Sequence, residues 1–104
     1  MTMTLTTEQS PARPTGPSPR RAALIDEIRW QVETMTGHLP SAAAPSVLDV
    51  AEIADKAYSR GVSRALFCDT VAEAVSMQRV VCQPRLLAAR LWALCDQMPS
   101  TTQP

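Results

Sequence analysis

The sequence has 104 residues, a length that suits one small domain. Its 10 basic and 10 acidic residues cancel, and since proteins bound mainly to DNA phosphates usually carry a basic excess, this balance makes DNA the second choice of partner after protein. There is no apolar run of the ~20 residues that span a bilayer, no export signal and no CxxC pair among the three cysteines, so we expect a cytoplasmic protein with reduced thiols and no membrane partner.

The two ends of the sequence differ from its middle in composition. Residues 1–17 are rich in Thr, Pro, Ser and Gln and show neither helical nor strand periodicity, which predicts a disordered N-terminal arm. Residues 99–104 have the same composition and are predicted to be a disordered tail. We therefore place one helical domain at residues 18–98.

The first predicted helix begins after Ser18, because serine is a good N-cap and Pro19 suits the first helical position. Gly37 is expected to end it. Helical spacing places a set of apolar residues on one buried face: Leu24, Ile25, Ile28, Val32 and Met35. Trp30 lies outside this face.

The second predicted helix follows a connector at residues 38–45. Ser46 is expected to cap it, with Asp49 three residues later as a short capping box, and Gly61 to end it. Its inward face is predicted to contain Val47, Val50, Ala51, Ala54, Ala57 and Tyr58.

The third predicted helix begins at Ser63, only two residues beyond Gly61, so the second and third helices should be antiparallel neighbours. Its apolar run extends to Val81 and covers more than half of its circumference, which favours either a central helix or one with an uncovered face. It includes Leu66, Phe67, Cys68, Val71, Ala74, Val75, Met77, Val80 and Val81.

Pro84 is expected to open a fourth helix whose apolar face contains Leu87, Ala88, Leu91, Leu94, Cys95 and Met98. No segment shows the sustained alternation of a β-strand. The sequence therefore predicts an all-α fold, a compact bundle of about four helices.

The residues that could support catalysis or metal binding do not form a recognisable site. The sequence has no Gly-rich phosphate loop and no nucleophile or zinc motif, and its single His38 lies in a connector. Asp49, Glu52 and Lys56 have the spacing of a solvated helix face, as do Asp69 and Glu73 on the third predicted helix. We expect no enzyme activity, no metal and no cofactor; a redox role for Cys82, the thiol expected to be reachable, would need a depressed pKa.

Large apolar residues at the margins of the predicted buried faces favour a protein-binding surface. They are Trp30, Leu66, Met77, Leu86 and Trp92. Trp30 is either an interface anchor or covered by the N-terminal arm or the 38–45 connector. The leading hypothesis is a non-enzymatic adaptor, inhibitor or chaperone-like regulator that binds another protein, itself as a homodimer, or both.

The alternative hypothesis is a dimeric helix-turn-helix regulator of transcription. Ala57, Gly61 and Phe67 have the spacing of that motif, although an ordinary helical hairpin would need the same glycine and cap. Under this hypothesis Ser63 and Arg64 begin the recognition helix. Arg60 and Arg79 would then contact phosphates.

Overall fold

Four helices make up the computed structural model, which describes residues 18–98. They are α1 (Pro19–Thr36), α2 (Pro45–Ser59), α3 (Arg64–Met77) and α4 (Pro84–Gln97). No strand occurs within residues 18–98. The predicted all-α bundle is therefore confirmed, while the predicted arm and tail lie outside the described residues.

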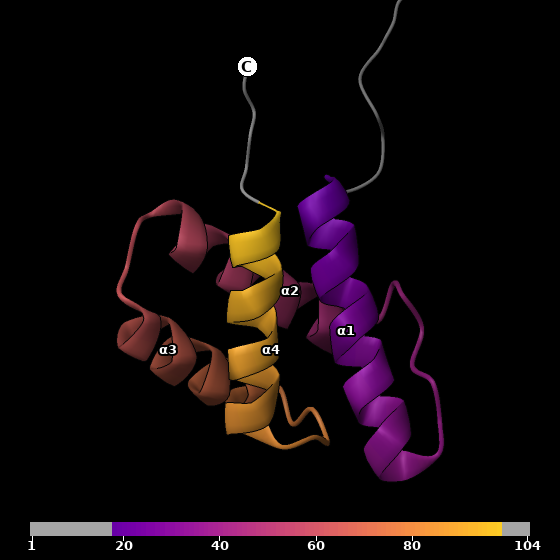
Figure 1. Ribbon diagram of the computed structural model, residues 1–104. Coiled ribbons are helices and arrows are strands. Elements are labelled where there is room, and N and C mark those ends of the chain that lie inside the picture. The colour runs from indigo at the N-terminus through magenta and orange to yellow at the C-terminus, as the bar shows by residue number, and fades with distance from the viewer. Residues whose placement is uncertain (1–17, 99–104) are drawn as a thin grey trace, which may run out of the picture.

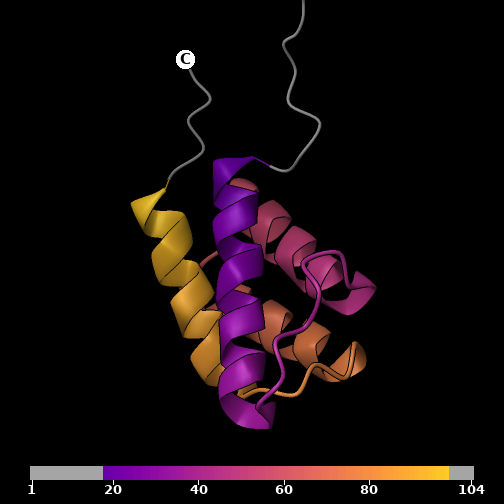
Figure 2. The ribbon, with the colours of Figure 1, turned by 90° about the vertical axis from the view of Figure 1, so that its right-hand side faces the viewer.

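The helices form two layers. α1 and α4 run side by side in opposite directions, and α2 and α3 cross behind them, also in opposite directions (Figures 1 and 2). α2 contacts the other three helices, whereas no Cα atom of α1 lies within 8 Å of one in α3. As a result, α1 begins and α4 ends at one end of the bundle, and α1 ends beside the α3–α4 link at the other (Figures 1 and 2).

The start and stop signals of α1 act as the sequence predicts. The Ser18 Oγ accepts a hydrogen bond from the backbone N–H of Arg21 at 3.1 Å, and Pro19 takes the first helical position. Gly37 adopts a left-handed conformation with φ of 80°, and its N–H donates to the Glu33 carbonyl. A residue with a Cβ would be strained at this position.

The start of α2 differs from the prediction. The helix begins at Pro45 with Ala44 as its N-cap residue, and no side chain caps it. Ser46 therefore lies inside the helix and is not its cap. Pro45 explains the difference, because its fixed φ suits the first helical position and its missing N–H needs no partner there. At the other end, Gly61 has a φ of 78° and terminates the helix as predicted.

The end of α3 also differs, because the helix stops at Met77 and leaves Val80 and Val81 in the link to α4. Arg79 adopts the left-handed conformation that glycine usually takes after a helix, with φ of 57°. The backbone N–H of Val80 then donates to the Val75 carbonyl at 3.0 Å and closes the last turn. The sequence did not predict this helix end because the apolar run continues past it and no glycine follows Met77.

Replacing Arg79 with glycine should stabilise the protein, because a residue with a Cβ is strained at this φ. We expect the free energy of unfolding to rise by about 0.5–1 kcal/mol, measured by urea denaturation. The control variant Arg79→Ala keeps a Cβ and should change stability by less than about 0.5 kcal/mol. Equal destabilisation by glycine and alanine would contradict this account.

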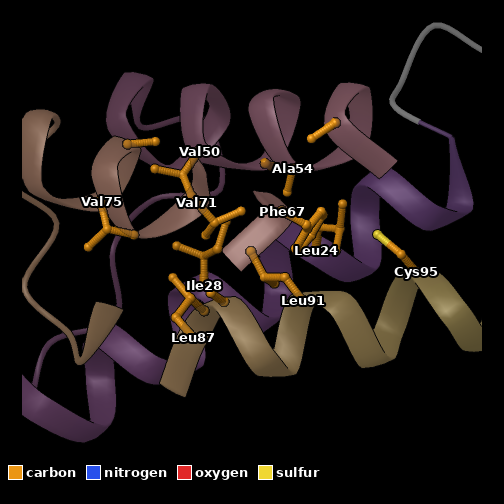
Figure 3. Packing of buried hydrophobic residues seen from close by; sticks show 14 of the residues in the cluster. Leu24, Ile28, Val50, Ala54, Phe67, Val71, Val75, Leu87, Leu91 and Cys95 are labelled. Atoms are coloured by element: carbon orange, nitrogen blue, oxygen red, sulfur yellow. The ribbon is translucent and has the colours of Figure 1, made fainter. Parts of the chain in front are cut away.

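The hydrophobic core lies between the two layers and receives side chains from all four helices (Figure 3). Phe67 is its largest fully buried side chain. The Trp92 ring is partly buried, with its centroid 5.2 Å from those of both Phe67 and Tyr58 in edge-to-face geometry. Trp92 was expected at a partner surface but packs against the core. The inward residues of α2 are small (Ala51, Ala54 and Ala57) and leave room for this aromatic cluster.

The last turn of α1 is not part of the core. Val32 is only partly buried and Met35 is 51% exposed, although helical spacing predicts both on the buried face. α1 has 18 residues whereas the other helices have 14 or 15. Since helix length grows by about 1.5 Å per residue, the last turn of α1 extends beyond the helices that cover its first part.

A partly buried ionic cluster joins the start of α1 to the end of α2. Arg20 is 7% exposed; it donates from Nε to Asp55 at 2.8 Å and from Nη2 to the Ser59 hydroxyl at 2.7 Å. Its guanidinium also lies 5.3 Å from the Tyr58 ring centroid, while its Nη1 has no hydrogen-bond partner among the described residues. Arg21 pairs with the other oxygen of Asp55 at 3.0 Å. Asp55 therefore receives both arginines in a partly buried contact, with 15% of its side chain exposed.

Removing the Asp55 carboxylate should destabilise the fold strongly, because Arg20 would remain buried without an ionic partner. We expect Asp55→Ala to cost about 3–5 kcal/mol in urea denaturation. The control is Asp69→Ala, which removes an exposed ion pair to Arg85 and should cost at most about 1 kcal/mol. Similar losses in both variants would show that Asp55 acts only as a surface charge.

Candidate functional site

The clearest surface feature is the number of large apolar side chains that the bundle leaves exposed. They are Trp30, Met35, Leu39, Leu48, Leu66, Met77, Val81 and Leu86. Single exposed apolar residues are ordinary on protein surfaces, so what matters is where these residues gather. Most of them define two surfaces, one at an end of the bundle and one along its side.

The first surface, here called the apolar end, consists of Met35, Leu39, Met77, Val81 and Leu86. Its residues belong to the last turn of α1, the start of the α1–α2 link, the end of α3, the α3–α4 link and the first turn of α4. These segments lie together at the end of the bundle away from Ser18 and Met98 (Figures 1 and 2). Met77 is the most exposed of them, at 72%.

The apolar end is also poor in charge. The sequence has no Asp, Glu, Lys or Arg between Glu33 and Asp49, and only Arg79 between Glu73 and Arg85. The opposite end carries the Arg20, Arg21 and Asp55 cluster described above and also Asp96. Depletion of charged residues distinguishes the buried centre of a protein interface from the rest of a surface.

The second surface is a shallow groove between α1 and α4, here called the α1–α4 groove, with a volume of about 410 Å³. It is lined by Ala23, Asp26, Glu27, Trp30, Arg90 and Leu94. The first four lie within two turns of α1 and share one helix face. Trp30 is 55% exposed, and the 38–45 connector therefore does not cover it.

The two walls of the α1–α4 groove have opposite charges. Asp26 and Glu27 lie on α1, and Arg90 lies on α4. Within α1, Asp26 pairs only loosely with Arg29 at 3.8 Å, and Glu27 accepts a hydrogen bond from Gln31 at 2.8 Å. Arg90 is exposed and forms no ion pair with another residue in the described range 18–98.

The residues predicted to bind a partner do not form one surface. Met77 and Leu86 lie at the apolar end, and Trp30 lies in the α1–α4 groove. Leu66 is exposed in the first turn of α3, at the opposite end of that helix from Met77. Trp92 packs against the core.

The residues of the DNA-binding alternative are likewise divided. Arg60, Ser63 and Arg64 surround the α2–α3 link, where the Ser63 hydroxyl caps α3 by accepting from Leu66 N–H at 3.1 Å. Arg79 lies beyond the other end of α3. The same helix also carries two carboxylates, Asp69 and Glu73, neither of them buried, which would repel phosphates.

Sequence reasoning missed several residues of both surfaces. Leu39 and Val81 lie in links, where no helical period identifies a surface, and Met35 has the spacing of a buried residue. Arg90 and Asp26 are ordinary polar residues on helices, and only the packing of α1 beside α4 brings them together. The sequence signal that did exist was the absence of charge around the two links.

The described residues offer little for metal or redox chemistry. Residues 18–98 contain no group of three His, Cys, Asp or Glu side chains placed to hold a metal ion. Burial raises the pKa of Cys82, and raises that of Cys95 to about 11. Cys68 is partly exposed like Cys82, so Cys82 is not the single reachable thiol. None of the described helices combines the length and apolar character needed to cross a membrane.

Comparison of the chain with known protein families, with curated protein sequences and with solved structures finds no match.

Cys82 and Cys95 should react slowly with iodoacetamide in the folded protein at pH 8, because a raised pKa leaves less thiolate. Cys95 is fully buried, so its rate should be roughly 100-fold or more below the rate in unfolded protein. Mass spectrometry of partly alkylated protein measures each site, with urea-unfolded protein as control. A Cys82 that reacts faster when folded would revive the redox hypothesis.

Proposed function

We propose that this chain is a non-enzymatic protein-binding module that acts through its apolar end. What supports the proposal is the gathering of five exposed apolar side chains in and beside two links whose only Asp, Glu, Lys or Arg residue is Arg79. The surface draws on α1, α3 and α4, and it binds a partner with a matching apolar surface. The function is that of an adaptor, an inhibitor or a chaperone-like regulator.

The energetics of the apolar end suit reversible binding. Complete burial of a Leu, Val or Met side chain is worth about 1.5–3 kcal/mol, and most of these residues are already about half covered, so each contributes roughly 1 kcal/mol on binding. Five such residues supply about 5 kcal/mol, which association costs largely offset. Further contacts from the partner are therefore needed, and they would set its identity.

The side chains of the apolar end also suit a partner that differs in shape from case to case. Met35 and Met77 are unbranched and exposed, and methionine adapts to irregular surfaces. Leu39 and Val81 lie on links between helices, where backbone adjustments disturb no helical hydrogen bonds.

DNA binding has less support than protein binding. The α2–α3 pair runs antiparallel (Figure 2), as the helical-hairpin interpretation of Gly61 also expects. α3 carries two acidic residues, Asp69 and Glu73, but only one basic residue, Arg64. Asp69 also pairs with Arg85 at 2.6 Å. A duplex docked on this helix would meet carboxylates as well as the basic residues of the link.

A charge placed at the apolar end should abolish partner binding, because a carboxylate buried without a counterion is costly. Met77→Glu and Leu86→Glu are each expected to weaken capture of the partner from extracts of the expressing cells by at least about tenfold. Quantitative mass spectrometry of the captured proteins, with circular dichroism to verify the fold, measures this effect.

The matched control is Leu66→Glu, the same kind of change at a similarly exposed leucine of α3. Proteins captured by the unchanged chain should remain with Leu66→Glu and disappear with the two apolar-end variants. If all three variants capture the same proteins as the unchanged chain, the apolar end is not the binding surface. If all three lose them equally, the contact depends on general hydrophobicity and the proposal fails.

A further inference from the structure

The α1–α4 groove has the charge pattern of a surface that is complementary to itself. Its acidic residues, Asp26 and Glu27, lie on one wall, and its basic residue, Arg90, lies on the other. Trp30 lies on the acidic wall and is half exposed, whereas Leu94 contributes apolar surface from the basic wall. The acidic wall of one copy is therefore complementary in charge to the basic wall of a second copy.

Two copies that meet face to face must be related by a two-fold axis that lies in the plane of contact. If this axis runs along the helices, α1 of each copy lies against α4 of the other. If it runs across the helices, α1 lies against α1 and α4 against α4. These two arrangements differ in the charges that they bring together.

The charges favour the first arrangement. With the axis along the helices, Asp26 and Glu27 of each copy face Arg90 of the other, and the favourable contact is made twice. With the axis across the helices, acidic walls would face each other, and the two copies of Arg90 would do the same. Like charges in a contact are strongly unfavourable, so only the first arrangement is consistent with a stable pair.

The aromatic residue supports the same arrangement. Trp30 and Arg90 line one groove from opposite walls. The two-fold axis along the helices then places the wall that carries Trp30 in one copy against the wall that carries Arg90 in the other, where the guanidinium can stack on the indole ring.

We propose that a second copy of this chain occupies the α1–α4 groove, forming a symmetric dimer in which α1 of each copy packs against α4 of the other. Trp30 is the apolar anchor of this contact, and Asp26, Glu27 and Arg90 set its orientation. The dimer uses the side of the bundle and leaves the apolar end of each copy free for another protein.

Charge reversal tests the arrangement. Sedimentation is measured at about 100 μM, where a dimer with a micromolar Kd is largely formed. The unchanged chain is expected to be dimeric, and Arg90→Glu and Asp26→Lys should each weaken the dimer by at least about tenfold, since each places like charges together. An equimolar mixture of the two variants should dimerise again, because each acidic wall then meets a basic one.

Further variants distinguish this dimer from self-association through a different surface. Trp30→Ala should be monomeric with its helicity unchanged, and the control Arg64→Glu, an equally drastic change on α3, should remain dimeric. A monomeric unchanged chain, or charge variants that remain monomeric when mixed, would overturn the proposal. Loss of the dimer in Met77→Glu but not in Arg90→Glu would place self-association at the apolar end, and this result would also overturn the proposal. The binding of other proteins at the apolar end is tested separately by the capture experiment described above.

Discussion

The contact between Asp55 and the arginine pair at positions 20 and 21 joins the start of α1 to α2. The connector between α1 and α2 has no regular structure and would allow α1 to pack on either side of the remaining helices. Its buried face is narrow, with Leu24, Ile25 and Ile28 as its main apolar contacts. The carboxylate of Asp55 receives both guanidinium groups and so ties the start of α1 to the end of α2.

Both of the proposed binding surfaces depend on the position of α1. Because the start of α1 is held at the end of α2, α1 runs beside α4 and its residues Asp26 and Trp30 come opposite Arg90. The same placement brings the last turn of α1 next to the α3–α4 link, where Met35 joins the apolar end (Figure 1). A partly buried ion pair is a weak source of stability compared with apolar packing, although the loss of one partner leaves the other charge buried without compensation.

The sequence predicted the elements of the fold better than their surroundings. Ser18 and Ser63 act as caps, Gly37 as a stop and Pro84 as a first helical residue, as predicted, because such preferences are local and need no knowledge of the tertiary structure. Predictions were wrong where two local preferences competed, as for Ser46 beside Pro45, or where the structure imposed an unfavourable conformation, as at Arg79. The role of Trp92 depended on space left by α2, which periodicity does not describe.

The candidate surfaces were predictable only in part, for a related reason. Trp30 could be identified as exposed because its helix has a clear buried face that excludes it. Leu39 and Val81 have no such reference, because links lack a period, and Arg90 gains its meaning only from the helix packed beside it. Surfaces made by several elements are encoded by packing, whereas single helix faces are encoded by spacing.

Ser18 and Met98 lie at the end of the bundle opposite the apolar end, which separates the two points of attachment from that surface. Both positions lie at the end of the bundle where α1 begins and α4 ends (Figures 1 and 2). Each of these two positions is therefore separated from the proposed apolar end by the length of a helix, roughly 20–25 Å. A partner bound at the proposed apolar end would be held away from these positions, so a fluorescent label attached at residue 18 or 98 would report on binding without blocking it.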